Sequence, residues 1–435
     1  MSDPYVPGHG DASYDVVHYD LSMSCKLVGN RIDAEAILRC VANEDLTWFA
    51  LDLHALSASK LLVDGKAPAK YTQRAGKLVV KVAAPIAAGR RFTVRVRYSG
   101  NPRPVPSKVL GDAGWEELED GVIVAAQPHG SPTWFPCNDR PDNKAPYRIV
   151  VTTHPDYTVI ANGTLESRKR QGSTVSWTYQ QDEPMATYLA TVQIGRYETR
   201  EFDSDILMLA AVPPDSVGDF EPAFGRQPEM MDVFTELFGA YPFSSYTVVV
   251  TADDLEIPLE SQSLSTFGRN FLTDDWDAVR LVAHELAHQW FGNAVTLREW
   301  RDIWLHEGFA CYAEWLWSER SGGDPADAQA RSHHERLAGL DQDLVLSDPG
   351  PDVMFDDRVY KRGALTLHTV RLNVGDDAFF DLLRAWVSEH SEGSVTTADF
   401  VAFASERTGV DLADLLSLWL DQPDLPDLPD LPAAN

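Results

Sequence analysis

The first half of the chain alternates apolar and polar residues at every second position. The segments KLVVKV (77–82) and FTVRVRYSG (92–100) show this pattern, and the Asn-Gly pair at 162–163 is typical of a turn between strands. A period of two places alternate side chains on opposite faces of a strand. The pattern up to about residue 200 therefore predicts an antiparallel β domain.

From about residue 225, apolar residues return every three or four positions, which is the period of a helix with one buried face. The segments 376–390 and 396–409 show it, and the second begins on a capping Thr396 and stops at Gly409. We therefore expect an α+β protein, with a β domain over residues 1–202 and a mainly helical domain over residues 203–421.

The end of the chain has a different composition. Residues 422–435 repeat Asp-Leu-Pro, and proline cannot continue a helix because it lacks a backbone N–H. The repeat predicts an extended, proline-rich tail. A disordered terminus is the alternative that this composition favours.

Length and composition set the broad class. A chain of 435 residues, 44% hydrophobic and with 12 Trp, is long enough for two or three packed domains. The polar start MSDPYVPGHG and the lack of any long apolar run argue against a signal peptide or a membrane span. Four cysteines without CxxC spacing favour the reducing cytoplasm.

The charge balance is strongly acidic, with 37 Lys and Arg against 66 Asp and Glu, a formal net charge of -29. Such a surface repels phosphate backbones and anionic lipids, so we expect neither nucleic acid nor a membrane as a partner. A simpler reading is that the acidity serves solubility alone.

The stretch AHELAHQWFG, residues 283–292, carries the first candidate chemistry. On a helix, His284 and His288 lie one turn apart on one face, and two neutral imidazoles at that spacing reach a single zinc ion. Glu285 follows the first ligand and is placed to act on a water at an open coordination position. The alternative at this point is a pair of core or solvated histidines.

A third ligand strengthens the metal hypothesis. Glu307 stands nineteen positions after His288 in a second amphipathic segment, far enough for a turn and a returning helix. Two histidines and one carboxylate leave one position open for water, which is typical of a catalytic rather than a structural zinc site. We expect one zinc ion per chain.

These motifs together resemble the aminopeptidase N family of zinc metallopeptidases, in which His-Glu-x-x-His is followed at this spacing by a segment similar to WLHEGFA (304–310). Other segments similar to the family occur in the family's order: HYDLSM (18–23), WFPCND (134–139), MATYLATVQIGRYE (185–198), FGNAVT (291–296) and YKRGAL (360–365).

The resemblance implies a saddle-shaped β domain followed by a thermolysin-like catalytic domain. It also implies a zinc aminopeptidase that removes amino-terminal residues from peptides with a free amino terminus. The chain ends before the large helical domain that many members add, so a more open cleft is expected.

The resemblance also assigns roles to single residues. Glu285 is the general base, and Tyr360 matches the tyrosine that stabilises the oxyanion. Glu260, in IPLESQSLSTFG (257–268), and Gln127 match positions that bind the substrate amine. For Glu260 and Gln127 the alternative is a surface or structural polar group, because the surrounding glycine-rich motif is degenerate.

Two departures from the family pattern stand beside these motifs. His306 replaces an Asn, and on a helix it points about 100° away from Glu307, so a structural or substrate-side role is expected. Arg362 replaces a common Lys. Asp302 and Glu314 are expected to hold the ligating histidines through their second ring N–H.

Two other functional classes stay open. The same zinc site could serve an endopeptidase or an epoxide-type hydrolase. A catalytically inactive interaction scaffold is a further alternative, although a scaffold has no need of an intact metal and proton-transfer set.

Overall fold

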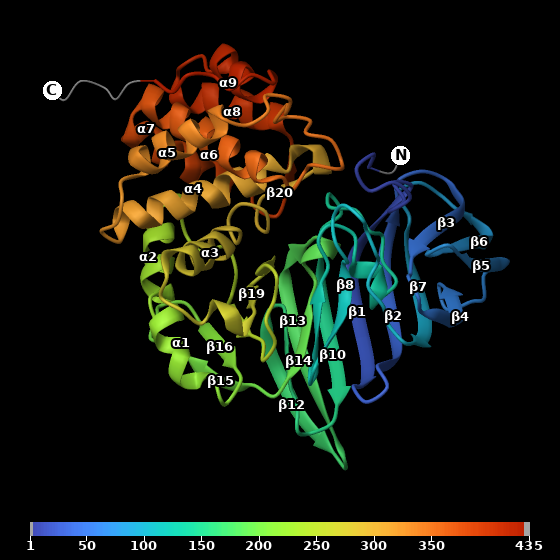
Figure 1. Ribbon diagram of the computed structural model, residues 1–435. Helices are drawn as coiled ribbons and strands as arrows, with labels where there is room; N and C mark the ends of the chain where they lie inside the picture. The colour runs from blue at the N-terminus through green and yellow to red at the C-terminus, as the bar shows by residue number, and fades with distance from the viewer. Residues whose placement is uncertain (1–2, 430–435) are drawn as a thin grey trace. The chain divides into compact units, whose positions relative to one another are not determined.

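The computed structural model describes residues 3–429, and contacts divide the chain into two units (Figure 1). The first unit comprises residues up to Gly218 together with Phe243–Asn270, and the second comprises Asp219–Pro242 and residues from Phe271 onward. This division differs from the predicted boundary at residue 202. The reason is strand pairing: β17 (Tyr246–Val250) runs parallel to β16 (Met208–Val212) and so joins the first unit.

The first unit contains a seven-stranded sheet of order β12-β13-β10-β1-β2-β7-β4. Its pairs are antiparallel except that β1 and β10 run parallel, so the predicted β domain is present with one parallel pair. Its strands are β1 (Tyr14–Lys26), β2 (Arg31–Ala42), β4 (Ser57–Val63), β7 (Arg91–Gly100), β10 (Ala145–Thr153), β12 (Thr164–Gln171) and β13 (Thr174–Met185).

Three smaller sheets complete this unit, with orders β11-β14-β9-β8, β3-β6-β5 and β15-β16-β17-β19-β18. Their remaining strands are β3 (Leu46–Asp52), β5 (Lys70–Arg74), β6 (Lys77–Ile86), β8 (Gly114–Leu118), β9 (Gly121–Ala125), β11 (Thr158–Ala161), β14 (Val192–Gly195), β15 (Glu198–Glu201), β18 (Leu259–Ser261) and β19 (Leu264–Phe267). Short 3-10 turns are η1 (Ser131–Thr133), η2 (Thr187–Leu189) and η3 (Arg269–Phe271).

The Asn-Gly turn between β11 and β12 reverses the chain and also holds neighbouring segments through hydrogen bonds. The buried Asn162 side chain donates to the carbonyls of Leu189 and Gln262 and accepts from the Thr191 amide. Gly163 has a φ of +79°, and a Cβ there would lie 2.1 Å from the Gln180 carbonyl oxygen. The turn therefore fastens the segment that carries β18 to the strands around it.

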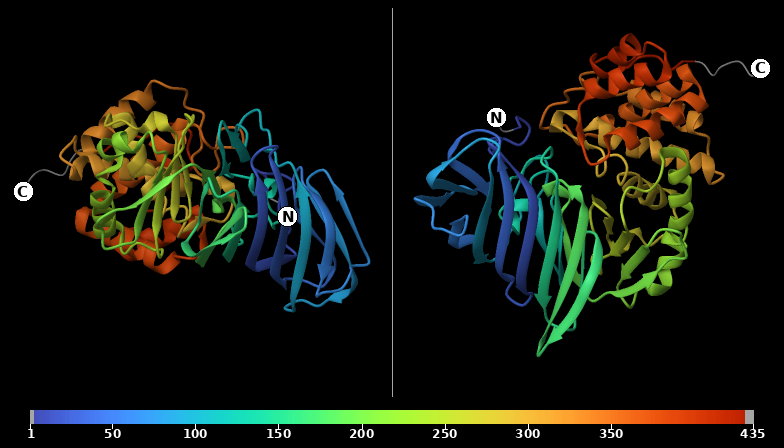
Figure 2. Two further views of the ribbon diagram at one scale, coloured as in Figure 1. Left: turned by 90° about the horizontal axis from the view of Figure 1, so that it is seen from below. Right: turned by 180° about the vertical axis from the view of Figure 1, so that it is seen from behind.

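The second unit is helical, and Figure 2 shows its helices packed side by side in both views. Its helices are α2 (Gln227–Phe238), α3 (Trp276–Ala287), α4 (Trp304–Arg320), α5 (Ala326–Ala338), α6 (Asp357–Val374), α7 (Asp376–His390), α8 (Thr397–Thr408) and α9 (Ala413–Leu420), preceded by α1 (Val217–Phe224). A short pair of strands, β20 (Thr296–Leu297) and β21 (Ser394–Val395), and the turn η4 (Trp300–Asp302) complete it.

Several predicted helix ends are confirmed. α7 covers the predicted segment 376–390, and α8 begins with a capping box in which Thr396 and Asp399 bond reciprocally. α8 ends at Gly409, whose φ of +69° lies in the left-handed region that glycine adopts without strain. Local sequence signals therefore define these helices.

α4 and α6 approach each other closely at two glycines. A Cβ built on Gly363 would lie 2.7 Å from the Cα of Gly308, so neither position has room for a side chain. Gly308 directly follows Glu307 on α4, and Gly363 lies three residues after Tyr360 on α6. This crossing sets the separation between the two helices that carry these candidate site residues.

The proline-rich tail is held against the second unit through its backbone. The buried guanidinium of Arg362 donates to five carbonyl oxygens at 2.5–3.2 Å, those of Leu344, Trp419, Gln422, Pro423 and Asp424. His334 donates to the Pro426 carbonyl and Arg331 to that of Pro429. Residues 422–429 are thus fixed, against the alternative of a disordered terminus, and residues 430–435 lie outside the described part.

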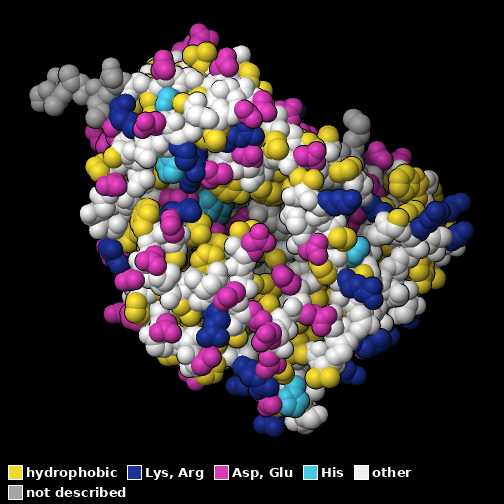
Figure 3. Space-filling view, viewed as in Figure 1, with side chains coloured by type: hydrophobic (Ala, Val, Ile, Leu, Met, Phe, Trp, Pro, Cys, Tyr) yellow, Lys and Arg dark blue, Asp and Glu magenta, His cyan; other side chains and the backbone are white. Residues whose placement is uncertain are grey.

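The structure shows where the acidic residues and the cysteines lie. Figure 3 shows Asp and Glu side chains spread over the visible faces of both units rather than gathered in one place. The four cysteines are buried free thiols. Within residues 3–429, no helix combines the length and apolar character needed to cross a bilayer.

Candidate functional site

The two histidines of the His-Glu-x-x-His motif lie at the end of α3. His284 is in the last turn, and His288 is the residue at which the helix ends. Both side chains are buried, with ring centroids 4.7 Å apart. The one-turn spacing therefore brings both rings to one side of the helix, as the sequence predicts.

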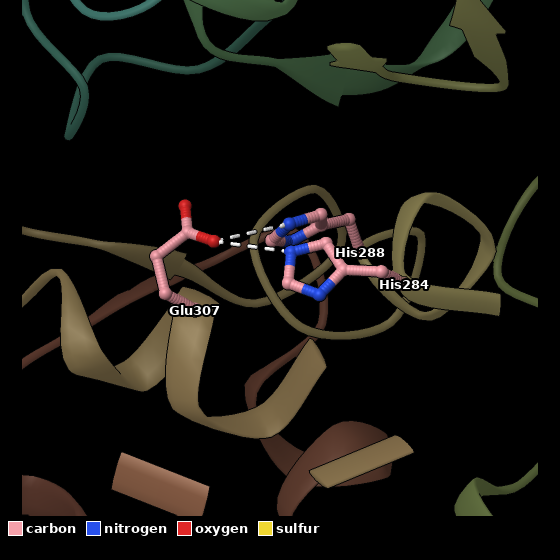
Figure 4. A group of neighbouring side chains, drawn as sticks. All are labelled: His284, His288 and Glu307. Carbon is pink, nitrogen blue, oxygen red and sulfur yellow. Dashed lines mark hydrogen bonds and ion pairs between the residues drawn. The ribbon is translucent and has the colours of Figure 1, made fainter. Parts of the chain in front are cut away.

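α4 brings Glu307 to the same point (Figure 4). One carboxylate oxygen, Oε2, lies 3.3 Å from His284 Nε2 and 3.4 Å from His288 Nε2. Tetrahedral ligands about 2.0–2.2 Å from zinc lie about 3.3–3.6 Å from one another. The separations and the donor set of two imidazoles and one carboxylate thus both fit a zinc ion.

The other ring nitrogens have partners that fix the orientation of both imidazoles. His284 Nδ1 lies 2.8 Å from Glu314 Oε1, and His288 Nδ1 lies 3.0 Å from the Phe291 carbonyl oxygen. A carbonyl or carboxylate accepts the Nδ1–H and leaves the Nε2 lone pair for a metal. Glu314 therefore has the predicted position beside His284, a candidate zinc ligand.

Asp302 does not have the position expected for it. Its Oδ1 accepts hydrogen bonds from the backbone N–H and the hydroxyl of Thr397, at 3.1 and 2.6 Å. The expectation that it holds a ligating histidine is therefore wrong. Asp302 instead ties η4 to the start of α8, and a backbone carbonyl serves His288.

The buried carboxylates are held in their charged form. Burial raises the pKa of Glu307, but attraction to His288 and hydrogen bonds with His284 and His288 outweigh it and bring the pKa well below its usual range. Burial likewise raises the pKa of Glu314, and attraction to Lys361 and the His284 hydrogen bond lower it to about 2. Both groups can therefore pair with cations at neutral pH.

Glu285 and Tyr360 lie near the same ligands. Glu285 is buried on α3, and one of its carboxylate oxygens lies within 4.8 Å of a ring nitrogen of His288. Tyr360 lies in the first turn of α6, where its ring is stacked against that of His284, with centroids 5.9 Å apart and an interplanar angle of 21°. The second unit thus brings together all five residues expected at the metal centre.

His306 has a structural contact. It is fully buried, and its Nε2 accepts a hydrogen bond of 2.8 Å from the Leu297 backbone N–H. This bond fixes the loop containing β20 to the start of α4. The side chain therefore plays the structural role that the helix geometry predicts, rather than that of a fourth ligand.

Gln127 and Glu260 belong to the first unit, where the structure places them in direct contact. Gln127 Nε2 donates to Glu260 Oε1 at 2.6 Å, across 133 positions of sequence. Glu260 is buried in the middle of β18, opposite Ser265 of β19. The two polar residues expected to share one ligand thus form one cluster within this unit.

The sequence reasoning missed three residues that surround Glu314. Arg280 NH1 lies 3.2 Å from Glu314 Oε2, Lys361 Nζ lies 3.6 Å from the same oxygen, and Lys361 Nζ also donates to Cys311 Sγ at 3.1 Å. Helix spacing offered a signal for two of them, because Arg280 precedes His284 by one turn and Cys311 follows Glu307 by one turn.

The chain is similar to known proteins along most of its length. The family model described as the peptidase family M1 domain matches residues 223–419, and that of the peptidase M1 N-terminal domain matches residues 16–189. The chain belongs to the M1 peptidase family. Together the two M1 models cover the strands from β1 to β13 and the helices α3, α4 and α6 that carry the candidate metal site.

Solved structures of M1 enzymes share the whole fold. An M1 zinc metallopeptidase from Deinococcus radiodurans is 29% identical with a TM-score of 0.91, covering 100% of this chain and 99% of that chain. A mutant of an M1 zinc metallopeptidase from that organism, bound to a Tyr-Ser-Ala substrate, also has a TM-score of 0.91. This M1 chain therefore matches a two-domain fold from end to end.

Curated M1 relatives are longer. Aminopeptidase M1 of Arabidopsis thaliana is 26% identical over 335 residues, which are 70% of this chain and 37% of that protein. Probable aminopeptidase 1 of Sulfurisphaera tokodaii is 25% identical over 418 residues, 91% of this chain and 52% of that protein. The chain thus spans between about a third and half the length of these relatives.

Proposed function

We propose that this protein is a zinc-dependent aminopeptidase, a hydrolase that removes amino-terminal residues from peptides. The observation that carries the proposal is that Glu307 Oε2 lies 3.3 Å from His284 Nε2 and 3.4 Å from His288 Nε2. When bound, zinc supplies Lewis acidity, which lowers the pKa of a coordinated water and polarises the peptide carbonyl. The M1 relatives named as aminopeptidases support this assignment.

Glu285 is proposed as the general base. Its buried carboxylate follows the candidate ligand His284 on α3 and lies within 4.8 Å of a ring nitrogen of His288. It accepts a proton from the water that attacks the carbonyl and then delivers a proton to the leaving amine. Burial excludes bulk water from competing for these protons.

Tyr360 is proposed to donate a hydrogen bond to the developing oxyanion. Replacing Tyr360 with Phe removes the hydroxyl and keeps the ring contact with His284. We expect kcat to fall by roughly 10²–10³ with little change in KM, because the bond forms mainly in the transition state. Steady-state kinetics at full zinc occupancy measure this, and unchanged kcat would return Tyr360 to a packing role.

Glu260 and Gln127 are proposed to bind the substrate amine. The 2.6 Å contact between them presents a carboxylate and an amide oxygen from one cluster, and an ammonium group can donate to both. An anionic group that binds the amino terminus fixes the distance between that terminus and the peptide bond that is cleaved. This property separates an aminopeptidase from an endopeptidase.

Glu260→Ala tests the aminopeptidase assignment directly. Loss of a charged hydrogen-bond partner costs about 1.5–3 kcal/mol, so kcat/KM on leucyl amide is expected to fall by roughly tenfold to more than a hundredfold. Acetyl-leucyl amide lacks the ammonium, so it should be a poor substrate for both proteins, and its kcat/KM should change little on substitution. The test measures four rates: the wild type and Glu260→Ala, each on both substrates.

The same four rates decide between the open alternatives. If the wild type cleaves the acetylated amide as fast as the free one, or if Glu260→Ala leaves their ratio unchanged, an endopeptidase reading replaces the aminopeptidase one. If the protein is an epoxide-type hydrolase, it should cleave neither the free amide nor the acetylated amide. The assembled metal and proton-transfer residues favour catalysis over a scaffold role, and the four buried thiols favour a reducing compartment such as the cytoplasm.

A further inference from the structure

A buried polar chain lies behind the metal donors, on the far side of His284 from Glu307. Its central member is Glu314, seven residues after Glu307 on α4 and buried. One carboxylate oxygen faces His284 Nδ1 at 2.8 Å, and the other faces two cations, Arg280 and Lys361. The orientation of Glu314 therefore depends on both the histidine and the cations.

The two cations are not equivalent. The Arg280 side chain is 30% exposed and also lies near Asp277, whose side chain is 95% exposed. The Lys361 side chain is only 7% exposed. Charges interact more strongly where water is excluded, so Lys361 acts on Glu314 more strongly than its longer distance of 3.6 Å indicates.

The second partner of Lys361 does not neutralise it. Nζ donates to Cys311 Sγ at 3.1 Å, and burial raises the pKa of that thiol to about 12, which keeps it uncharged at neutral pH. A neutral thiol is a weak acceptor. The ammonium charge of Lys361 is therefore balanced by Glu314 among the groups it contacts.

Lys361 also stands next to Tyr360 on α6. Successive helix residues point about 100° apart, and here one contacts the ring of His284 while the other contacts the carboxylate bound to its Nδ1. Two consecutive residues of α6 therefore act on His284: Tyr360 through ring stacking, and Lys361 through Glu314. A change in the position of α6 would affect both contacts.

We propose that Lys361 is a positioning residue for the metal centre, which keeps the Glu314 carboxylate directed at His284 Nδ1 so that His284 presents Nε2 to zinc. The inference rests on the proposed zinc site but not on the identity of the substrate. Removal of the outer partner of a ligating histidine, here Glu314, typically weakens metal binding by about 10–100-fold, and loss of Lys361 has this effect to the extent that it misplaces Glu314.

The test compares zinc affinity, measured by competition with a chelator, across matched variants. Lys361→Met keeps the length of the side chain and removes the charge, and it should weaken zinc binding by about 10–100-fold. Lys361→Arg should restore affinity to within a few-fold of wild type. Cys311→Ala removes the neutral partner and should leave affinity nearly unchanged.

A double-mutant cycle separates positioning from general destabilisation. If Lys361 acts through Glu314, the variant Lys361→Met/Glu314→Gln should bind zinc no more weakly than Glu314→Gln alone. Additive losses, or wild-type zinc affinity in Lys361→Met, would overturn the proposal. Thermal unfolding of the zinc-free proteins establishes that each variant folds, and Lys361→Gln replaces the Met variant if that one does not.

The readout also distinguishes this inference from the proposed function. Zinc affinity is measured without any substrate, so a protein that fails to cleave leucyl amide still reports on Lys361. Conversely, a fully active enzyme whose Lys361→Met variant keeps its zinc affinity would leave the aminopeptidase assignment intact and remove the positioning role.

Discussion

Glu285→Gln is expected to retain zinc and lose turnover. The amide keeps the size of the carboxylate and adds no charge, and Glu285 is not among the three candidate zinc donors, His284, His288 and Glu307. Loss of a positioned general base typically costs 10²–10⁴ in rate, so kcat should fall by roughly that factor. Zinc per chain by elemental analysis and kcat on leucyl amide, from the same sample, are the two measurements.

Glu307→Ala is the matched control, because it removes a ligand and leaves the base in place. With only two imidazoles remaining, zinc should dissociate during dialysis and activity should disappear with it. Added zinc should recover part of the activity of this variant but none of that lost in Glu285→Gln. Equal loss of zinc from both variants would contradict the division of roles between ligand and base.

The sequence predicts the candidate metal donors because they are close together along the chain. His284 and His288 are one turn apart on a helix that the apolar period already defines, and Glu307 lies in the next amphipathic segment. The contact of Gln127 with Glu260 crosses 133 positions and depends on how strands of two segments pack. The family resemblance named both residues, but no periodicity in the chain connects them.

Other features were hidden because they depend on tertiary placement. Asp302 lies near the second motif in sequence, yet its nearest donors belong to Thr397 at the start of α8, ninety-five positions away. Lys361 looks like one more solvent-facing charge until α4 places Cys311 and Glu314 around its ammonium group. The β17–β19 segment was similarly assigned to the helical half, because its parallel partner β16 precedes two helices.

A single residue, Arg362, orders part of a tail whose composition favours disorder. Asp-Leu-Pro repeats are typical of an extended or disordered chain, but carbonyl oxygens are strong acceptors in either case. Arg362 has five N–H donors and meets five carbonyl oxygens, three of them in the tail, a number that the three hydrogens of a Lys ammonium cannot match. The departure from the family Lys therefore coincides with the ordering of residues 422–424.

Arg362→Met is accordingly expected to destabilise the second unit strongly. Burial lowers the pKa of Arg362 to about 10, so the guanidinium is still charged at neutral pH, and the five carbonyls are its hydrogen-bond acceptors. A buried acceptor left without its donor typically costs about 1–3 kcal/mol, so loss of these contacts should cost about 3–5 kcal/mol, or roughly two to nearly four powers of ten in the unfolding equilibrium. Urea unfolding measures the loss, and Arg362→Lys should fall between the two.

Arg331→Met is the control for a general effect of removing an arginine from the tail contact. Among the described tail residues, 422–429, Arg331 donates only to the Pro429 carbonyl, and it also forms a partly exposed pair with Asp327, so its loss should cost at most about 1 kcal/mol. Hydrogen exchange at the Leu425 amide, which donates to Gln342 Oε1, reports whether the tail has detached. Faster exchange in Arg362→Met than in Arg331→Met is expected. Equal stability of the two variants would contradict the prediction. It would mean that water replaces the carbonyl contacts of Arg362 without a change in the free energy of unfolding.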